Sequence, residues 1–386
     1  MTLAVETAVR IEPDHVRQGH LSVVVFGPGT GEAVLIKFPD GQLGVIDGCR
    51  RGKQSADPVR DLLKALQVKR LLFACLTHPH EDHYGGLVDL VKTFEPAHLL
   101  WAGTEHERLL ETFAKSFREY QRRGGAIADE VSATELHDLI RAFVTRSQRR
   151  GKTKPGCRAQ GLSDHKLLLT IPGQPPVEIW SVLPTTTALH RAFGKNSASA
   201  STATSDQENC DDGVDPNDIS GALVVRWGTT SVLLGGDVLT GSPGHHEGWC
   251  VADWIQGPVQ VVKVPHHASR GAHCQELWDR MKPCVALVTP FRNAGGPQPP
   301  QESMLQELAR QVEHLLVTSC PKWWPGQSAL TIEEAWDAPT AIVGTPLPNA
   351  KPASRDYGAI SVSVDDAGQV LRIVAAGSAR KMQLRR

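Results

Sequence analysis

Three histidines and one aspartate fall within six residues of the sequence, in the stretch THPHEDHYGG. They directly follow the apolar run Leu71–Leu76, which has the composition of a buried strand. His78 and His80 alternate in a short loop, so their imidazoles can converge on one ion, while Asp82 and His83 can face a second ion across the turn. Neutral imidazole and carboxylate oxygen are good ligands for zinc, manganese or iron. The spacing therefore predicts a metal site at the end of this strand.

Further aspartates and histidines occupy the same kind of place in the sequence. Asp47 follows an apolar run, Asp237 follows another run and a Gly-Gly pair, and His266-His267 follow a third run and a proline. A side chain just past a strand end can project into the cleft at the edge of a sheet, so we expect these residues to join the site. We favour His266 as a metal ligand, with His267 contacting substrate or hydrogen-bonding a carboxylate.

The elements that must position these residues form two strand-rich halves, each flanked by helices. β-branched runs bounded by Gly, Pro and Asp predict strands over 21–26, 33–38, 43–46, 71–76, 98–101, 166–171, 177–183, 222–227, 231–234, 259–264, 284–289, 315–318, 359–364 and 370–374. Apolar residues at helical spacing predict helices from Pro58, with Asp57 as N-cap, and over 87–94 and 302–314. We therefore expect one α/β domain over residues 1–386, built as a four-layer αββα sandwich.

Two segments depart from this strand-rich pattern. Residues 104–159 contain long helical stretches and predict a helical insertion, and residues 195–217 are small and polar, which predicts a flexible loop. Basic residues without any acid occur from 141 to 158, namely Arg141, Arg146, Arg149, Arg150, Lys152, Lys154 and Arg158. This run could contact a nucleic-acid backbone. An exposed helix end followed by a basic linker explains it equally well.

Composition limits the classes of function. The 386 residues carry 41 Lys and Arg against 42 Asp and Glu, a net charge of -1, which argues against nucleic-acid binding driven by the whole surface. No apolar run approaches the roughly 18 residues of a membrane span, and residues 1–20 lack an apolar signal core. None of the eight cysteines forms a CxxC pair, so we expect reduced thiols. These features predict a cytoplasmic protein with no membrane partner.

The motifs resemble those of a known family. THPHEDHYGG is similar to the signature of the metallo-β-lactamase fold hydrolases. The resemblance implies that Asp47 is the first-motif aspartate and that Asp237 bridges two metal ions. Gly-Gly-Asp237 followed by VKVPHHASR resembles the ComEC-type hydrolases, as does the N-x-x-S segment of Asn217 and Ser220. The resemblance covers about residues 21–103 and 160–375 and excludes the insertion.

Two departures from the family pattern affect the expected ligands. No histidine stands near Val182-Leu183-Pro184, where the third motif would place one. The first metal would then be held by His78, His80 and Asp237, with an open position or with His190 from the loop. In the HHGS motif, Ala268 replaces the glycine.

The resemblance and the residues together lead to a functional expectation. Two divalent ions, zinc or manganese with magnesium as an alternative, would activate water as hydroxide for attack on a phosphodiester. Asp47 would orient a ligand histidine. The residues expected to act in catalysis are Asp82, Asp237 and His267, the metal ligands are His78, His80, Asp82, His83, Asp237 and His266, and the substrate contacts are Ser269, Arg270, Asn217 and Ser220. The expected activity is that of a phosphodiesterase or nuclease acting on DNA or another nucleotide substrate.

Two alternatives remain open at the level of the sequence. The same site suits hydrolysis of a small molecule such as a cyclic nucleotide, a phosphorylcholine-like ester, a lactone or a thioester. The chain could also serve a multi-protein system, for example in anti-phage defence. Residues 104–159 and the segment Lys322–Pro325 would then contact a partner protein.

Overall fold

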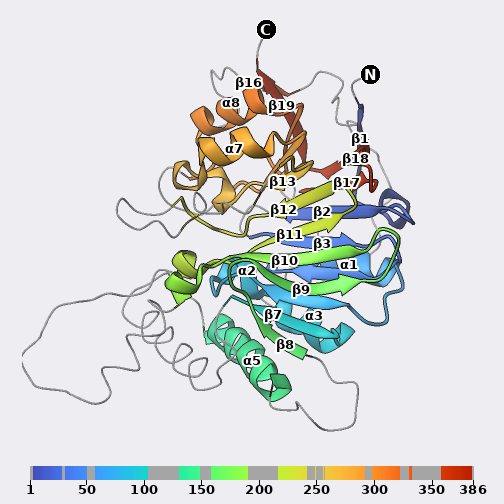
Figure 1. Cartoon of the computed structure of the whole chain (residues 1–386), viewed down its shortest axis with the longest axis vertical. Coiled ribbons are helices and arrows are strands. Elements are labelled where there is room, and N and C mark those ends of the chain that lie inside the picture. Colours follow the sequence, from blue (N-terminus) through green and yellow to red (C-terminus); the bar gives the residue numbers. More distant parts are fainter. Residues whose placement is uncertain are drawn as a thin grey trace, which may run out of the picture.

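The computed structural model describes residues 3–27, 31–49, 57–102, 130–147, 158–189, 216–240, 248, 255, 257–291, 298–321, 330–332 and 358–384. These residues form two stacked mixed sheets with helices on both outer faces, which is the αββα sandwich expected from the sequence (Figure 1).

The first sheet contains nine described strands, drawn from the N-terminal half and the C-terminal hairpin. In spatial order they are β1 (Val5–Ala8), β18 (Val370–Gly377), β17 (Gly358–Val364), β2 (Leu21–Gly27), β3 (Ala33–Lys37), β4 (Leu43–Ile46), β6 (Phe73–Leu76), β7 (His98–Trp101) and β8 (Arg158–Gly161). Strands β4, β6, β7 and β8 run parallel, so their carboxyl ends lie at one edge of the sheet. A short strand β5 (Gly48–Cys49) follows β4 and bridges to residues 84 and 85.

The second sheet also contains nine described strands. In spatial order they are β16 (Leu330–Ile332), β19 (Arg380–Leu384), β15 (His314–Val317), β14 (Val285–Val288), β13 (Val261–Lys263), β12 (Thr230–Leu234), β11 (Ala222–Trp227), β10 (Val177–Leu183) and β9 (Lys166–Ile171). Strands β12, β13, β14 and β15 are parallel, and their carboxyl ends again share one edge.

Three buried apolar clusters hold the layers together. One lies between the two sheets and takes residues such as Val25 and Leu287 from each of them. The other two lie under the outer helices, which bury one face each. The helices over the first sheet are α1 (Pro58–Ala65), α2 (Glu81–Tyr84), α3 (Leu87–Phe94) and α5 (Glu130–Ser147), and those over the second are α7 (Gln275–Met281) and α8 (Glu302–Gln311). In Figure 1, α8 and α5 lie at opposite ends of the molecule.

Local sequence signals explain several of these helices. Asp57 caps α1 as expected, because its carboxylate accepts a hydrogen bond from the backbone N–H of Arg60 at 3.0 Å. Helix α3 has the predicted bounds, and its N-cap Gly86 takes a left-handed φ of 82°. Most residues on one face of each helix are buried, so tertiary packing accounts for helices this short.

The described part of the helical insertion belongs to the outer layer of the domain. In α5, Leu136, Leu139, Ile140 and Phe143 are buried in the core beneath the first sheet. The Phe143 ring lies 6.0 Å from that of Trp101. The strand β8 at residues 158–161 was not expected, because its first two residues were attributed to the insertion and the next strand was expected only from residue 166. Residues 104–129 and 148–157 lie outside the described part.

The structure corrects further expectations. Helix α8 ends at Gln311 because His314 already begins strand β15, whereas we expected the helix to continue to residue 314. Helix α7 and strands β1, β16 and β19 were missed. Cys274 is disulfide-bonded, so the expectation of reduced thiols throughout is wrong at this position. Spacing along a chain does not show which cysteines meet in space. No helix among the described residues is long and apolar enough to span a membrane.

Candidate metal centre

The histidine-rich loop and both later motifs meet at one edge of the sandwich. In the first sheet, β4 leads into Asp47 and β6 into His78. In the second sheet, β12 leads into Asp237 and β13 into His266 and His267. Because the strands in each group are parallel, their carboxyl ends deliver these side chains to a common place.

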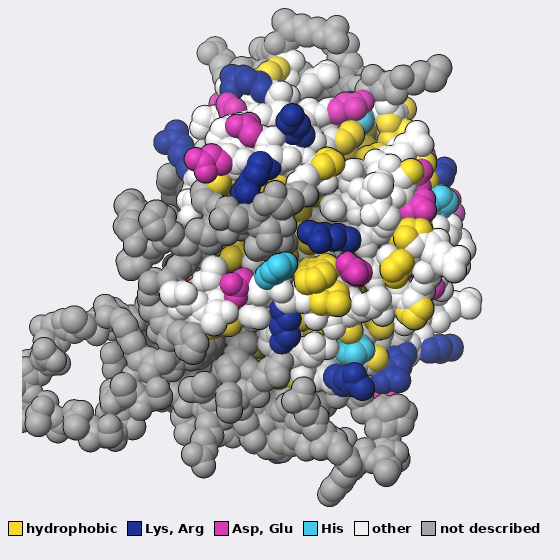
Figure 2. Space-filling model, in the orientation of Figure 1, with side chains coloured by type: hydrophobic (Ala, Val, Ile, Leu, Met, Phe, Trp, Pro, Cys, Tyr) yellow, Lys and Arg dark blue, Asp and Glu magenta, His cyan; other side chains and the backbone are white. Residues whose placement is uncertain are grey.

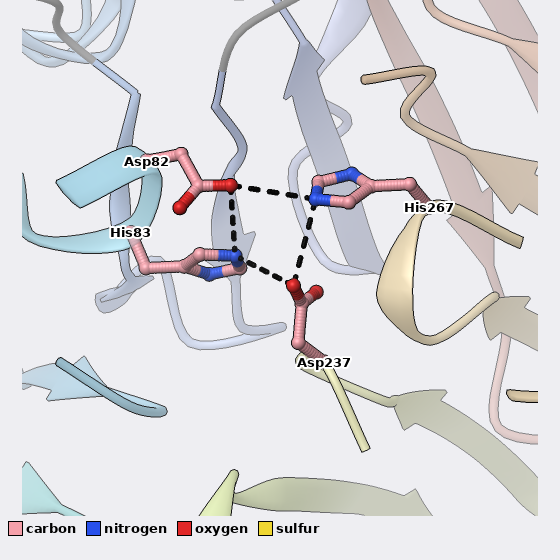
Figure 3. Close-up of side chains that lie close together, drawn as sticks. All are labelled: Asp82, His83, Asp237 and His267. Atoms are coloured by element: carbon pink, nitrogen blue, oxygen red, sulfur yellow. Dashed lines mark ion pairs between the residues drawn. The ribbon is translucent and has the colours of Figure 1, made fainter. Parts of the chain in front are cut away.

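Four side chains form the centre of the site: Asp82, His83, Asp237 and His267 (Figure 3). One ligand atom from each lies within 4.8 Å of all the others. Asp237 Oδ2 is 3.3 Å from His83 Nε2 and 3.5 Å from His267 Nε2. Asp82 Oδ2 is 3.4 Å from His267 Nε2 and 3.7 Å from His83 Nε2. Two imidazoles and two carboxylates thus point their donor atoms at one another.

The tautomers of both histidines are set by their surroundings. His83 Nδ1 donates to Asp47 Oδ2 at 2.8 Å, and His267 Nδ1 donates to the backbone carbonyl of Thr289 at 2.8 Å. The Nε2 atom of each ring is therefore left to face the cluster. Asp47 is itself held by the backbone N–H and hydroxyl of Thr77 at 2.8 and 2.7 Å. Asp47 thus connects the ring of His83 to the backbone and side chain of Thr77.

Of the other two histidines of the loop, His78 lies beside both His83 and Asp237, with its ring centroid 4.1 Å from that of His83. His78 Nε2 is 3.8 Å from Asp237 Oδ2 and 3.0 Å from His80 Nδ1. His78 Nδ1 contacts the hydroxyls of Thr77 at 3.1 Å and Ser220 at 3.3 Å. Asp237 Oδ2 thus faces His78 as well as the other members of the four-residue centre.

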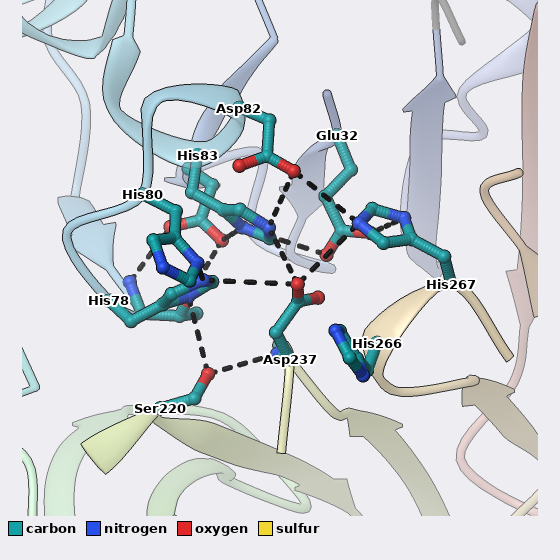
Figure 4. Close-up of polar contacts among 12 residues, drawn as sticks. Glu32, His78, His80, Asp82, His83, Ser220, Asp237, His266 and His267 are labelled. Carbon is teal, nitrogen blue, oxygen red and sulfur yellow. Dashed lines mark hydrogen bonds and ion pairs between the residues drawn. The ribbon is translucent and has the colours of Figure 1, made fainter. Parts of the chain in front are cut away.

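The histidine pair does not behave as expected. His267 reaches the four-residue centre, whereas the Nδ1 of His266 pairs with Ser269 Oγ at 2.8 Å. His266, His267 and Ala268 all have positive φ values, at 44°, 54° and 58°. This left-handed turn aims His267 inward, and no sequence pattern predicts it. The structure therefore favours His267 as the ligand and leaves His266 beside the centre (Figure 4).

Electrostatics of the buried cluster follow from this packing. Burial alone would lower the pKa of His83, but the carboxylates of Asp237, Asp82 and Asp47 together raise it well above the usual value. The pKa of His267 is likewise raised, since Asp237 and Asp82 outweigh its burial. Burial would raise the pKa of Asp237, yet His83 and His267 hold it well below its ordinary range. The carboxylates therefore favour the protonated form of both histidines, and the histidines favour the charged form of Asp237.

The donor set suits a divalent cation. His83 Nε2 and Asp237 Oδ1 are buried and have no hydrogen-bond partner, which is unusual for polar atoms inside a protein. Nitrogen and carboxylate oxygen donors in this number match zinc or manganese. Burial by itself lowers the pKa of His78, with His83 and His80 adding to the effect, so this ring stays neutral and available as a ligand. A cation at the centre would give His83 Nε2 the partner that it lacks.

Two buried residues of the site were missed in the sequence. Glu32, just before β3, and Lys263, the last residue of β13, form an ion pair directly behind the cluster. Glu32 Oε1 is 3.9 Å from His83 Nδ1, and its Oε2 is 3.7 Å from His267 Nδ1. A lysine inside a buried strand of apolar residues, in the run VVKV, was the signal that could have indicated a buried partner.

The remaining predicted residues are more dispersed. Ser220 belongs to the centre, because its hydroxyl accepts from the backbone N–H of Asp237 at 2.9 Å. Arg270 is exposed, and its Nη2 lies 3.5 Å from Ser303 Oγ. Asn217 is half-buried at the short helix 216–219. The side chain of Arg146 and all of Arg149, Arg150, Lys152 and Lys154 lie outside the described residues, as do His190, residues 195–215 and Lys322–Pro325.

Asp47 offers a direct test of ligand orientation. Asp47→Asn keeps the shape but cannot accept from His83, Thr77 N–H and the Thr77 hydroxyl all at once, so the His83 ring loses its fixed tautomer. We expect affinity for Zn²⁺ to fall about 10- to 100-fold, as for other residues that orient metal ligands. Isothermal titration calorimetry measures this. Asp138→Asn, which removes an exposed carboxylate paired with Lys92, should bind as the wild type does. Unchanged affinity in Asp47→Asn would contradict the assigned role.

A comparison with family models matches part of the chain. Residues 19–147 match the family model described as the metallo-beta-lactamase superfamily. Those residues include Asp47 and the whole histidine-rich loop. A search of curated proteins finds no match.

Similar solved structures share little sequence with the chain. A motif mutant of a metallo-β-lactamase from Cronobacter sakazakii is 14% identical, with a TM-score of 0.30, and the alignment covers 58% of this chain and 63% of that one. A long-form RNase Z from yeast is 9% identical, with a TM-score of 0.38, over 80% of this chain and 42% of that one. A diphosphatase from the PhnP family is 12% identical, with a TM-score of 0.32, over 69% and 85%. The chain thus covers less than two thirds of the length of the first of these structures.

The matched residues contain the motif loop, and the second sheet brings Asp237 and His267 to the same edge of the sandwich. Residues 19–147 of the chain are therefore similar to the metallo-beta-lactamase superfamily.

Proposed function

We propose that this protein is a metal-dependent phosphodiesterase acting on DNA or another nucleotide substrate. The observation that carries the proposal is the buried group of Asp82, His83, Asp237 and His267, with each histidine oriented through its Nδ1. Divalent ions, when bound, supply activation of water and stabilise negative charge on a phosphoryl group.

The residues of the site differ in how far their side chains are exposed to solvent. The side chain of Asp82 is 18% exposed, whereas those of His83, Asp237 and His267 are at most 4% exposed. Substrate therefore approaches from the side of Asp82, where this carboxylate can accept a proton. His83 and His267 stay oriented through Asp47 and Thr289, and Asp237 remains a carboxylate because its pKa is well below its ordinary range.

The choice of a phosphodiester rests on the segment around the histidine pair. Residues 262–270 resemble the corresponding segment of the ComEC-type hydrolases, in which the residues after HH are small and polar. Here Ala268, Ser269 and the exposed Arg270 follow the pair. An exposed guanidinium group three residues after His267 suits a phosphate oxygen, which it can bind through two hydrogen bonds.

Charge over the visible surface favours a local contact with substrate. Lys and Arg side chains are interspersed with Asp and Glu on the described part of the face in Figure 2. A nucleic acid would therefore need a local basic segment, and the run from 141 to 158 is the candidate. Its described members, Arg141 and Arg158, are exposed.

Neutralising this run tests its contact with nucleic acid. A variant with Arg146, Arg149 and Arg150 changed to Ala should bind DNA more weakly and with a flatter salt dependence, because each lost phosphate contact lowers the slope by about one. Fluorescence anisotropy at several salt concentrations measures both quantities. An unchanged affinity and slope would show that the run does not contact the substrate.

A substrate panel tests the proposed activity itself. The protein, supplemented with Mn²⁺, Mg²⁺ or Zn²⁺, is assayed on single- and double-stranded DNA, RNA, a cyclic nucleotide and bis-p-nitrophenyl phosphate. We expect hydrolysis of the diester and of a polymer. Turnover confined to the cyclic nucleotide would move the assignment to a small-molecule hydrolase. No phosphodiester turnover with any metal would contradict the proposal.

A further inference from the structure

A buried ion pair connects the two sheets directly behind the metal centre. Lys263 Nζ donates to Glu32 Oε1, and the two side chains are 1% and 2% exposed. Glu32 precedes β3 of the first sheet, and Lys263 ends β13 of the second. Burying two charges carries a large desolvation penalty, so the pair is poorly explained by stability alone.

Lys263 holds the backbone that carries Asp237. Its Nζ donates to the carbonyl of Gly236 at 2.9 Å and lies 4.0 Å from Asp237 Oδ1. Gly236 has a φ of 50°, and a Cβ atom there would lie 2.4 Å from the carbonyl oxygen of Gly221. The turn before Asp237 is therefore tightly confined, and the ammonium group determines the direction of its carbonyl.

Glu32 reaches the other two ligand-bearing segments. Its Oε2 accepts from the hydroxyl of Thr289 at 2.5 Å, and the carbonyl of the same Thr289 accepts from His267 Nδ1. The backbone N–H of Glu32 donates to the carbonyl of Asp82 at 3.1 Å. Figure 4 shows Glu32 between His83 and His267. Through Glu32 and Lys263, the segments of Asp82, Asp237 and His267 are all connected.

We propose that Glu32 and Lys263 form a positioning clamp, in which the buried pair holds Asp82, Asp237 and His267 at the separations a divalent ion requires. The inference rests on the metal centre of the proposed function and is independent of the substrate. The charges of Glu32 and Lys263 sum to zero, so the pair adds no net charge to the metal centre. Each partner is hydrogen-bonded to a different ligand-bearing segment, so the pair acts by holding those segments in position.

Metal titration of two single variants tests the clamp. Glu32→Gln keeps the shape without the charge, and Lys263→Met keeps the length without the ammonium group. We expect both to weaken Zn²⁺ binding about 10- to 100-fold by isothermal titration calorimetry, as for other residues that hold ligands in place. If either single variant fails to fold, the double variant Glu32→Gln, Lys263→Met leaves no lone buried charge and should show the same weakening.

The control variant removes another buried ammonium group, that of Lys37 in the first sheet. Lys37 lies at the far end of β3, about 17 Å from Glu32 at about 3.3 Å per strand residue. Its Nζ donates to the carbonyl of Val16, and the control is Lys37→Met. We expect its Zn²⁺ affinity to match that of the wild type. Thermal unfolding and circular dichroism confirm that each variant is folded.

The sign of the effect separates a clamp from a simple charge effect. A change in charge alone would weaken binding in Glu32→Gln but strengthen it in Lys263→Met, and this opposite pattern would overturn the proposal. Affinities within twofold of the wild type in folded variants would overturn it as well. If the wild-type protein binds no metal, the metal centre itself is contradicted, and the proposed function is contradicted with it.

Discussion

Asp237→Asn should abolish metal-dependent turnover. Asp237 Oδ2 faces His83, His267 and His78 at 3.3, 3.5 and 3.8 Å, so this carboxylate is shared by both sides of the site. The amide of asparagine lacks the negative charge of the carboxylate. Its NH2 group also cannot bind a metal ion as a carboxylate oxygen does. We expect turnover of bis-p-nitrophenyl phosphate to fall at least about 100-fold, the loss seen when a single electrostatic contact to the transition state is removed. Steady-state hydrolysis with saturating Mn²⁺ measures this.

The same chemical change at Asp138 provides the matched control for Asp237→Asn. Asp138 is an exposed residue of α5, and its carboxylate pairs with Lys92 at 2.8 Å. Asp138→Asn should retain wild-type turnover, since exposed ion pairs contribute little. Asp237→Asn with more than half of the wild-type rate, in a folded protein, would show that the chemistry occurs elsewhere.

Metal should stabilise the protein more strongly as pH rises above about 6.5, the usual pKa of histidine. In the metal-free protein, the pKa values of His83 and His267 are raised by the surrounding carboxylates. Their contribution to stability is therefore present below about pH 6.5 and is lost as pH rises through the raised values. The carboxylates then lose their balancing charge, and a divalent ion restores it. Metal at a hundredfold excess over its Kd adds about 2.7 kcal/mol.

Thermal unfolding with and without Zn²⁺, between pH 6 and 9, measures this linkage. We expect the metal-free Tm to fall across the range and the metal-induced gain in Tm to grow. Affinity should rise by about tenfold per pH unit for each proton that the ion displaces, while those histidines remain protonated. A metal-induced gain that is constant or shrinks with pH would contradict the assigned protonation of His83 and His267.

Much of the fold follows from local sequence. Strands such as β4, β7, β9 and β11 have the predicted bounds, because short apolar runs between turn residues leave few other conformations. The strands that were missed have different causes. β8 and β19 are rich in polar or basic residues, and both are edge or near-edge strands whose pairing depends on neighbours distant in sequence.

The candidate site was predictable in its motifs and less so in its details. The THPHEDH loop and Asp237 are recognisable because each stands at the end of an apolar strand. The choice between His266 and His267 depends on three successive left-handed residues, which only the folded backbone reveals. Glu32 is separated from Lys263 by 231 residues, and such a pairing is created by the stacking of the two sheets.

The most direct test of the account is a combined titration of metal-depleted protein. Mn²⁺ or Zn²⁺ is added in steps, and bound metal and hydrolysis of bis-p-nitrophenyl phosphate are measured in the same samples. We predict no turnover without metal, a rise that follows occupancy, and neither binding nor turnover in Asp237→Asn. Turnover by the metal-depleted protein, or full occupancy of the wild type without any phosphodiester hydrolysis, would contradict the account.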